Sequence, residues 1–225
     1  MSNLNNLLFG VYPYIAILVC IVASWIRFDR EPYTWKADSS QMLSKKGFRV
    51  ASNLFHIGVI FILLGHFVGL LTPESVYHYV ITSANKQLLA MVSGGFFGIL
   101  CLIGLLMLIK RRLTDDRVRA SSKTSDIALL FMLLIQLVLG LLTIVVSMDH
   151  LDGSVMIMLG NWAQSIVTFQ GMQAAASIEP VHIIYKLHVF VGLTMILVFP
   201  FTRLVHIISV PVWYFGRRYQ VVRQR

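Results

Sequence analysis

Charged residues are scarce in this chain, and cysteine is almost absent. Only 13% of the 225 residues are Asp, Glu, Lys or Arg, whereas 57% are hydrophobic. A soluble domain of this length could not bury that much apolar surface around one core, so the composition excludes an ordinary soluble protein. The two cysteines, Cys20 and Cys101, both lie in apolar runs. They cannot build a disulfide framework, a CxxCH attachment motif or an iron–sulfur cluster.

Five apolar runs are long enough to cross a bilayer, which takes about 20 residues in a helix. They predict an all-α, polytopic membrane protein that forms one integral membrane domain over residues 1–225. The longest connection, residues 147–182, is expected to hold a helix that includes Trp162 to Phe169 and lies on the outer surface. The five expected spans cover about residues 5–28, 49–72, 87–110, 126–147 and 183–210.

The basic residues are unevenly distributed over the segments between these runs. In a five-span topology, all of the 19 Lys and Arg except Lys86 and Lys186 fall on one side. By the positive-inside rule this side is cytoplasmic, which places the N-terminus outside and the C-terminus inside. The first charge, Arg27, follows the first apolar run, so we expect a retained span rather than a signal peptide. The net charge of +9 is a topology signal, helped by anionic lipid or an acidic partner, and it requires no nucleic acid.

Four histidines lie inside the second and fifth runs: His56, His66, His188 and His206. Ionisable or ligating side chains inside a span are rare and indicate function. At 1.5 Å per residue along a helix axis, His56 and His66 are about 15 Å apart. On a continuous helix, His188 and His206 are about 27 Å apart. Since the runs are antiparallel, His66 shares the outer level with His188, and His56 shares the inner level with His206. A straight fifth helix would carry both of its histidines on one face.

Two level pairs of imidazoles on facing helices are suited to clamping iron porphyrins. A bare zinc or copper ion would need further ligands, and no cysteine or carboxylate lies at these levels. We therefore predict two haem b groups stacked across the membrane between the second and fifth helices, about 20 Å apart. Six-coordinate iron has no open position for oxygen chemistry, so the expected role is electron transfer.

Small residues lie close to these histidines in the second run and recur in the third. Gly58, Gly65 and Gly69 would let a macrocycle approach the helix backbone. Gly65 with Gly69, and Gly94 with Gly98, also fit the GxxxG pattern of helix packing, which we expect to be their main role.

A single histidine in a membrane span more often bonds between helices or belongs to a proton path. A small transporter with a histidine proton relay is therefore the non-redox alternative, and a reduced-minus-oxidised optical spectrum would distinguish it. The remaining histidines, His78, His150 and His182, fall in or beside outer loops and are expected to be solvated. His182 would also lie about 240° from His206 around a helix, which makes it a poorer ligand than His188.

Long stretches of the sequence carry a family resemblance. They are VYPYIA at 11–16, YTWKADSSQML at 33–43, ASNLFHIG at 51–58, GHFVGLLTP at 65–73, LGLLTI at 139–144, HLDGS at 150–154, WAQSIVTF at 162–169 and FPFTRLVHIISVPVWY at 199–214. With these stretches, the chain resembles the gamma subunit of bacterial respiratory nitrate reductase, the membrane cytochrome b of that complex, over essentially its whole length.

The resemblance implies a distal, outer haem b on His66 and His188 and a proximal, inner one on His56 and His206. It implies a place in the bacterial cytoplasmic membrane, and two partners on the cytoplasmic side. These are an iron–sulfur beta subunit and a molybdenum-containing alpha subunit that reduces nitrate. Menaquinol or ubiquinol would be oxidised near the outer face, and electrons would pass inward, with no nitrate-reducing site on this chain. The alternative is a cytochrome b subunit of a hydrogenase or formate dehydrogenase.

The resemblance also implies a quinol site made by Lys86, His66 and the backbone at Gly65. A quinol hydroxyl that loses its proton needs a cationic or hydrogen-bonding group nearby. The alternative role for Lys86 is a snorkelling anchor at the start of the third span. Lys186 is the competing cation, but it points about 200° away from His188.

Two further groups of basic residues are predicted at the inner face. Arg112 and Arg203 are candidates for pairing with haem propionates. The arginine-rich end after Tyr214 is expected to help hold the catalytic subunits.

Overall fold

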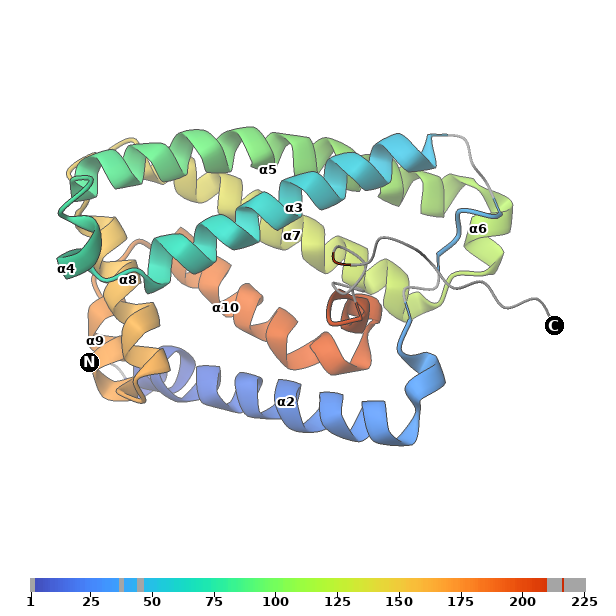
Figure 1. Ribbon diagram of the computed structural model, residues 1–225, viewed down its shortest axis with the longest axis horizontal. Helices are drawn as coiled ribbons and strands as arrows, with labels where there is room; N and C mark the ends of the chain where they lie inside the picture. Colours follow the sequence, from blue (N-terminus) through green and yellow to red (C-terminus); the bar gives the residue numbers. More distant parts are fainter. Residues whose placement is uncertain (1–2, 37–38, 44–46, 210–215, 217–225) are drawn as a thin grey trace.

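The computed structural model describes residues 3–36, 39–43, 47–209 and 216, and the regular structure in these residues is helical (Figure 1). The arginine-rich end after Tyr214 lies outside the described residues. The longer helices are α2 (Tyr12–Arg30), α3 (Phe48–Leu71), α5 (Ser83–Thr114), α7 (Thr124–Ser147), α8 (Ser154–Val167) and α10 (Ile183–Val198). The shorter ones are α1 (Asn3–Asn6), α4 (Glu74–Tyr77), α6 (Asp116–Ala120), α9 (Gly171–Ile178), the π-helical η1 (Leu7–Val11), and the 3-10 helices η2 (Pro32–Thr34), η3 (Phe199–Phe201) and η4 (Arg203–Ile207).

The predicted all-α fold with five spans is confirmed. In the described part of the chain, five helical segments are long and apolar enough to cross a membrane. They cover Asn3–Arg30, Phe48–Leu71, Ser83–Thr114, Thr124–Ser147 and Ile183–Phe201. The third segment begins at Ser83, before the predicted residue 87, because Thr82 caps the helix. The Thr82 hydroxyl accepts a hydrogen bond from the Asn85 N–H at 3.3 Å.

The two ends of the bundle differ in charge. The N-terminus, α4, α8 and α9 gather at one end, which we call the N-terminal end (Figure 1). The opposite end, which we call the basic end, holds α6 and the last turns of α2 and α5, where Arg27, Arg30, Arg111 and Arg112 lie. Positive side chains in the last turn of a helix also interact favourably with the negative end of the helix dipole.

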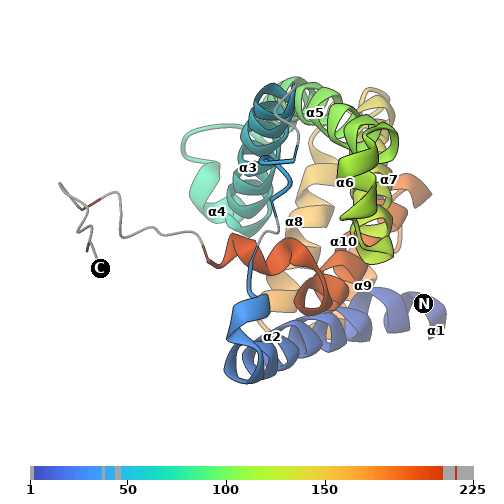
Figure 2. The same ribbon diagram turned by 90° about the vertical axis from the view of Figure 1, so that its right-hand side faces the viewer.

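Neighbouring long helices pack in the order α3, α5, α7, α10 and α2. This order leaves α3 and α10 facing each other across the bundle (Figure 2). The packing of α3 on α5 is close: a Cβ at Gly58 would meet the Cβ of Cys101 at 2.6 Å. Gly58 is therefore a packing residue between helices, not part of a surface for a macrocycle.

The predicted GxxxG packing is wrong for three of its four glycines. A Cβ at Gly65, Gly69 or Gly94 would meet nothing within 4 Å, so these residues are not where helices touch. Only Gly98 packs closely, since a Cβ there would meet the Cδ2 atom of Leu141 at 2.7 Å.

The connection between α7 and α10 forms two helices, α8 and α9, and both pack one face against the N-terminal end of the bundle. Trp162 on α8 is only 9% exposed, and its Nε1–H donates to the Phe9 carbonyl at 3.0 Å. Trp162 and Phe9 share a buried cluster with Ile178 of α9. The apolar faces of α8 and α9 thus form a core that closes the N-terminal end.

The fifth span is shorter than predicted. A continuous helix to residue 210 was expected, but α10 ends at Val198 and two short 3-10 helices follow. Pro200 has no N–H to continue the helical ladder, and its ring clashes with a preceding carbonyl. The segment after α10 consequently runs across the bundle instead of along it (Figure 2).

Candidate functional site

The first histidine pair joins two uninterrupted helices. His66 on α3 and His188 on α10 have ring centres 6.0 Å apart, with the ring planes inclined by 40°. The Nδ1–H of His66 donates to the Ile62 carbonyl at 2.8 Å, one turn earlier in α3. The Nδ1–H of His188 donates to the Gln136 carbonyl of α7 at 3.2 Å.

The second pair lies nearer the basic end. His56 on α3 and His206 on η4 have ring centres 6.5 Å apart, with the planes inclined by 71°. The Nδ1–H of His56 donates to the Ser52 carbonyl at 2.7 Å. The Nδ1–H of His206 donates to the Arg203 carbonyl at 2.5 Å. The structure therefore brings together the two pairs that the matched depths predicted, although His206 does not lie on the same straight helix as His188.

These hydrogen bonds set the tautomer of all four rings. A carbonyl oxygen only accepts, so each Nδ1 carries the proton and each Nε2 keeps a free lone pair. Histidines that bind a metal through one ring nitrogen usually donate the other N–H to a carbonyl or carboxylate. The four histidines thus share the bonding pattern of metal ligands.

The ring separations suit two imidazoles on opposite sides of one metal ion. A metal–imidazole bond is about 2 Å long, so two opposed Nε2 atoms lie about 4 Å apart and the ring centres about 6 Å apart. The observed 6.0 and 6.5 Å agree with this spacing. Among the described residues, no group of three or more His, Cys, Asp or Glu is placed to hold a metal ion. This donor set would fit an iron porphyrin, which needs only two protein ligands because its macrocycle supplies the other four.

Two residues of α7, Gln136 and Gly140, help to place the His188 ring. Gln136 supplies the accepting carbonyl, and a Cβ at Gly140 would meet the Cε1 atom of His188 at 3.0 Å. They lie four residues apart and so share one helix face. Sequence reasoning missed both, because no periodicity shows which carbonyl of a third helix a histidine will reach.

Lys86 lies at the start of α5, against the end of α3. Its Nζ donates to the Thr72 carbonyl at 3.5 Å and sits 3.5 Å from the centroid of the Tyr77 ring. Thr72 follows His66 by six residues, so these contacts are more than one helical turn beyond that ring. Lys86 borders a small pocket that Glu74 and Gln164 also line, with free space of about 10 Å³, which is room for about one water molecule.

Lys186, the competing cation, has a different partner. Its Nζ donates to the Glu179 carbonyl at 2.7 Å, at the end of α9. It thus ties α10 to the preceding segment.

The two propionate candidates meet at an acidic residue. Arg112 Nη1 lies 3.5 Å from one oxygen of Asp126, and Arg203 Nε lies 3.4 Å from the other. Arg112 also donates to the Ser122 hydroxyl at 2.9 Å. Two guanidinium groups share one carboxylate here, so the cluster keeps a net positive charge. Sequence reasoning missed Asp126, although an acidic residue at the start of an apolar run beside a basic loop was a visible signal.

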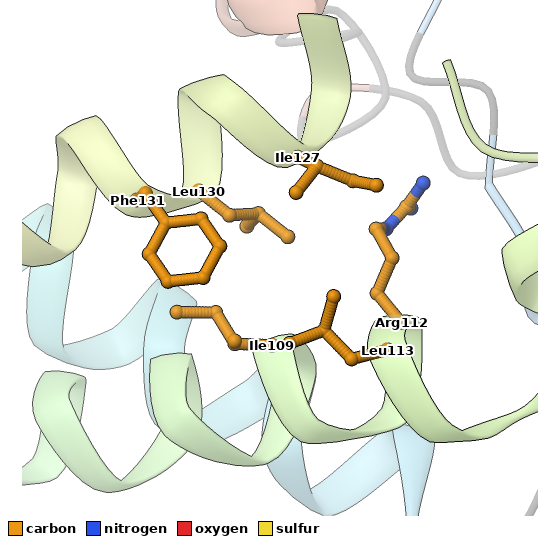
Figure 3. A pocket seen from close by; sticks show the side chains of 6 residues that line it. All are labelled: Ile109, Arg112, Leu113, Ile127, Leu130 and Phe131. Atoms are coloured by element: carbon orange, nitrogen blue, oxygen red, sulfur yellow. The ribbon is translucent and has the colours of Figure 1, made fainter. Parts of the chain in front are cut away.

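A small hollow beside Arg112 is too small for a cofactor. It lies between α5 and α7 and has almost no free space, whereas ligand pockets usually measure about 300–1,000 Å³. Its walls are otherwise apolar: Ile109, Leu113, Ile127, Leu130 and Phe131 (Figure 3).

Comparison with known proteins gives the family. The family described as nitrate reductase gamma subunit matches residues 5–225. The chain belongs to this family. It is 52% identical to the respiratory nitrate reductase 1 gamma chain of Escherichia coli (strain K12), over all of both chains. It is 51% identical to the respiratory nitrate reductase 2 gamma chain of the same organism, over all of this chain and 99% of that one.

A more distant gamma chain matches over nearly the same length. The nitrate reductase gamma chain of Bacillus subtilis (strain 168) is 34% identical over 98% of this chain and 99% of its own. Membership of the nitrate reductase gamma subunit family confirms the resemblance carried by the quoted stretches. Together with five long apolar helices, it makes this chain a membrane protein.

Proposed function

We propose that this chain is the membrane cytochrome b subunit of a respiratory nitrate reductase, which takes electrons from quinol and delivers them to the catalytic subunits. The observation that carries the proposal is the pair of facing imidazole couples, with ring centres 6.0 and 6.5 Å apart. All four rings are held in one tautomer by backbone carbonyls.

His66 and His188 would hold one haem b, and His56 and His206 would hold the second. When bound, the two haems would supply one-electron transfer between the two ends of the bundle. The chain's own contribution is to fix the four Nε2 lone pairs on apolar helical segments. The hydrogen bonds at Nδ1 also raise the basicity of the ligands, which strengthens their bonds to iron.

We propose that the basic end is cytoplasmic and the N-terminal end is periplasmic, since positive residues are retained inside. The iron–sulfur beta subunit and the molybdenum-containing alpha subunit would then dock at the basic end. The net positive charge of the cluster formed by Arg112, Asp126 and Arg203 would attract the propionates of the haem held by His56 and His206.

Quinol would be oxidised at the N-terminal end, where Lys86 is the functional cation. Lys86 is held by the Thr72 carbonyl and the Tyr77 ring, so its ammonium group is fixed at the edge of the small pocket. We propose that it donates a hydrogen bond to a quinol oxygen; the other two predicted members of the quinol site, His66 and Gly65, are not among the residues that line this pocket. A cation at that oxygen stabilises the negative charge that develops as the proton leaves.

The proposal is tested by purifying the complex in detergent and measuring the haem content of this chain. The expected result is two b haems per chain, with a low-spin b-type difference spectrum after reduction by quinol. A preparation with no haem absorbance would contradict the proposal and favour a proton-relay transporter. Reporter fusions at the two ends of the chain would test the orientation, with the N-terminal fusion expected outside.

A further inference from the structure

The segment that carries His206 begins with a sharp turn at the end of α10. Thr202 has an extended backbone, with φ −116° and ψ 179°, so the helix cannot continue through it. Its hydroxyl donates to the Phe199 carbonyl at 3.0 Å and accepts the Leu204 N–H at 3.2 Å. Thr202 thus ends one helical piece and caps the next, η4.

The turn leaves carbonyl groups without helical partners, and Arg27 of α2 binds two of them. Arg27 Nη1 donates to the Pro200 carbonyl at 2.6 Å and to the Thr202 carbonyl at 2.9 Å. Helix breaks inside a membrane protein are tolerated where another group satisfies the freed backbone atoms. A guanidinium group is suited to this task because it has five N–H donors in a rigid plane.

Arg27 is itself held on its other side. Its Nη2 donates to the Thr34 carbonyl at 3.0 Å, and its Nε donates to the Thr34 hydroxyl at 3.2 Å. The guanidinium group therefore links η2 to the turn after α10. Arg30, three residues further along α2, is exposed, which is the usual state of a basic residue that serves only as a topology signal.

We propose that Arg27 is the positioning residue that fixes the turn after α10 and so sets where the His206 ring meets His56. The connection is short: Arg27 binds the Thr202 carbonyl, η4 starts at the next residue, and the Arg203 carbonyl accepts the Nδ1–H of His206. This inference rests on the proposed role of His206 as a haem ligand. His66 and His188 do not depend on the turn, so Arg27 should act on one pair alone.

The test compares Arg27→Gln, Arg27→Lys and the matched control Arg30→Gln in the complete complex. Hydrogen exchange is measured for peptides that cover residues 199–207 and, as an internal reference, residues 183–198. The low-spin ferric haem signals are measured by electron paramagnetic resonance in the same preparations. Exchange reports the turn without needing the haem, and the resonance spectrum reports the ligand geometry of each haem.

Arg27→Gln should raise exchange in residues 199–207 by about tenfold or more, since bonds from a charged donor are lost. Exchange in residues 183–198 should not change. One of the two haem signals should shift or broaden while the other keeps its position. Arg27→Lys should give intermediate values, because an ammonium group can reach the carbonyls but cannot also bind Thr34 as guanidinium does. Arg30→Gln should match the unaltered protein.

Unchanged exchange in residues 199–207 of Arg27→Gln would overturn the inference. Raised exchange with both haem signals unchanged would also overturn it, because the turn would then not set the ligand. His206→Gln, made in parallel, separates this failure from a failure of the proposed function. If His206→Gln keeps both haems, the ligand assignment is at fault; if it loses one haem, only the role of Arg27 is rejected. Where Arg27→Gln assembles too poorly to measure, Arg27→Lys decides by the same two readouts.

Discussion

The two histidine pairs have similar ring separations but are built in different ways. His66 and His188 project from α3 and α10, both of which are continuous helices at these positions. His56 also projects from α3, but its partner His206 lies on a short 3-10 helix after a turn. The comparison shows that two histidines predicted at the same depth in the membrane can pair even when the helix expected to carry one of them ends before that residue.

The difference also predicts unequal sensitivity to substitution. The position of the His188 ring depends on packing against α7, through the Gln136 carbonyl and Gly140. The position of His206 depends on a local turn held by Thr202 and Arg27. Packed helices resist displacement better than a single turn, because many contacts must change together.

The largest effect is expected from removing a ligand. His188→Ala should reduce the haem content from two to one per chain, because the haem between α3 and α10 would lose one of its two protein ligands. The haem at His56 and His206 should remain. Haem content per chain by the pyridine haemochrome assay measures this, and His78→Ala is the matched control because that histidine is exposed at the same end. Retention of both haems in His188→Ala would remove this residue from the ligand set.

Replacing the helix breaker should affect the other pair. Pro200→Ala restores an N–H and relieves a penalty of about 3 kcal/mol against continuous helix. The chain after Val198 should then tend to continue α10, which moves His206 away from His56. We expect partial loss of one haem signal in the resonance spectrum and no change in the other. Equal loss of both signals would show that the turn has no special connection with one pair.

Lys86 should affect electron entry but not haem content. Lys86→Ala should slow haem reduction by quinol about 10- to 100-fold, the loss expected for one hydrogen bond from a charged donor. Both haems should stay in place, and small-molecule donors should still reduce them. Stopped-flow reduction kinetics measure the rate, and Lys186→Ala is the control because that ammonium group bonds to the Glu179 carbonyl. Unchanged quinol kinetics would make Lys86 a membrane anchor.

The smallest effect is expected at Gly140. A methyl group there would lie 3.0 Å from the His188 ring, so the ring must move by a few tenths of an ångström. Gly140→Ala should therefore shift the resonance position of the haem at His66 and His188 without loss of either haem. Gly94→Ala, where a Cβ meets nothing within 4 Å, should leave the spectrum unchanged. Identical spectra for the two variants would show that α7 does not constrain His188.

The positions of the spans could be predicted from the apolar runs, because a bilayer requires long uninterrupted apolar helices. The two histidine pairs could also be predicted, since depth follows from residue number in antiparallel helices. The end of the fifth helix could not be predicted in this way. Apolar residues continue on both sides of Pro200, so hydropathy alone does not show that the helix ends before it. The packing of α8 and α9 against the bundle could not be predicted for a related reason: Trp162 is apolar enough for a membrane surface or for a core. Contacts such as Arg27 with the Thr202 carbonyl arise only from tertiary structure.

The central claim, that the histidines act as two separate pairs, is tested most directly by combining substitutions. His66→Ala with His188→Ala removes both members of one proposed pair, and His66→Ala with His206→Ala removes one member of each. Haem content per chain should be one in the first double variant and zero in the second. One haem retained in the second variant, or none in the first, would contradict the pairing.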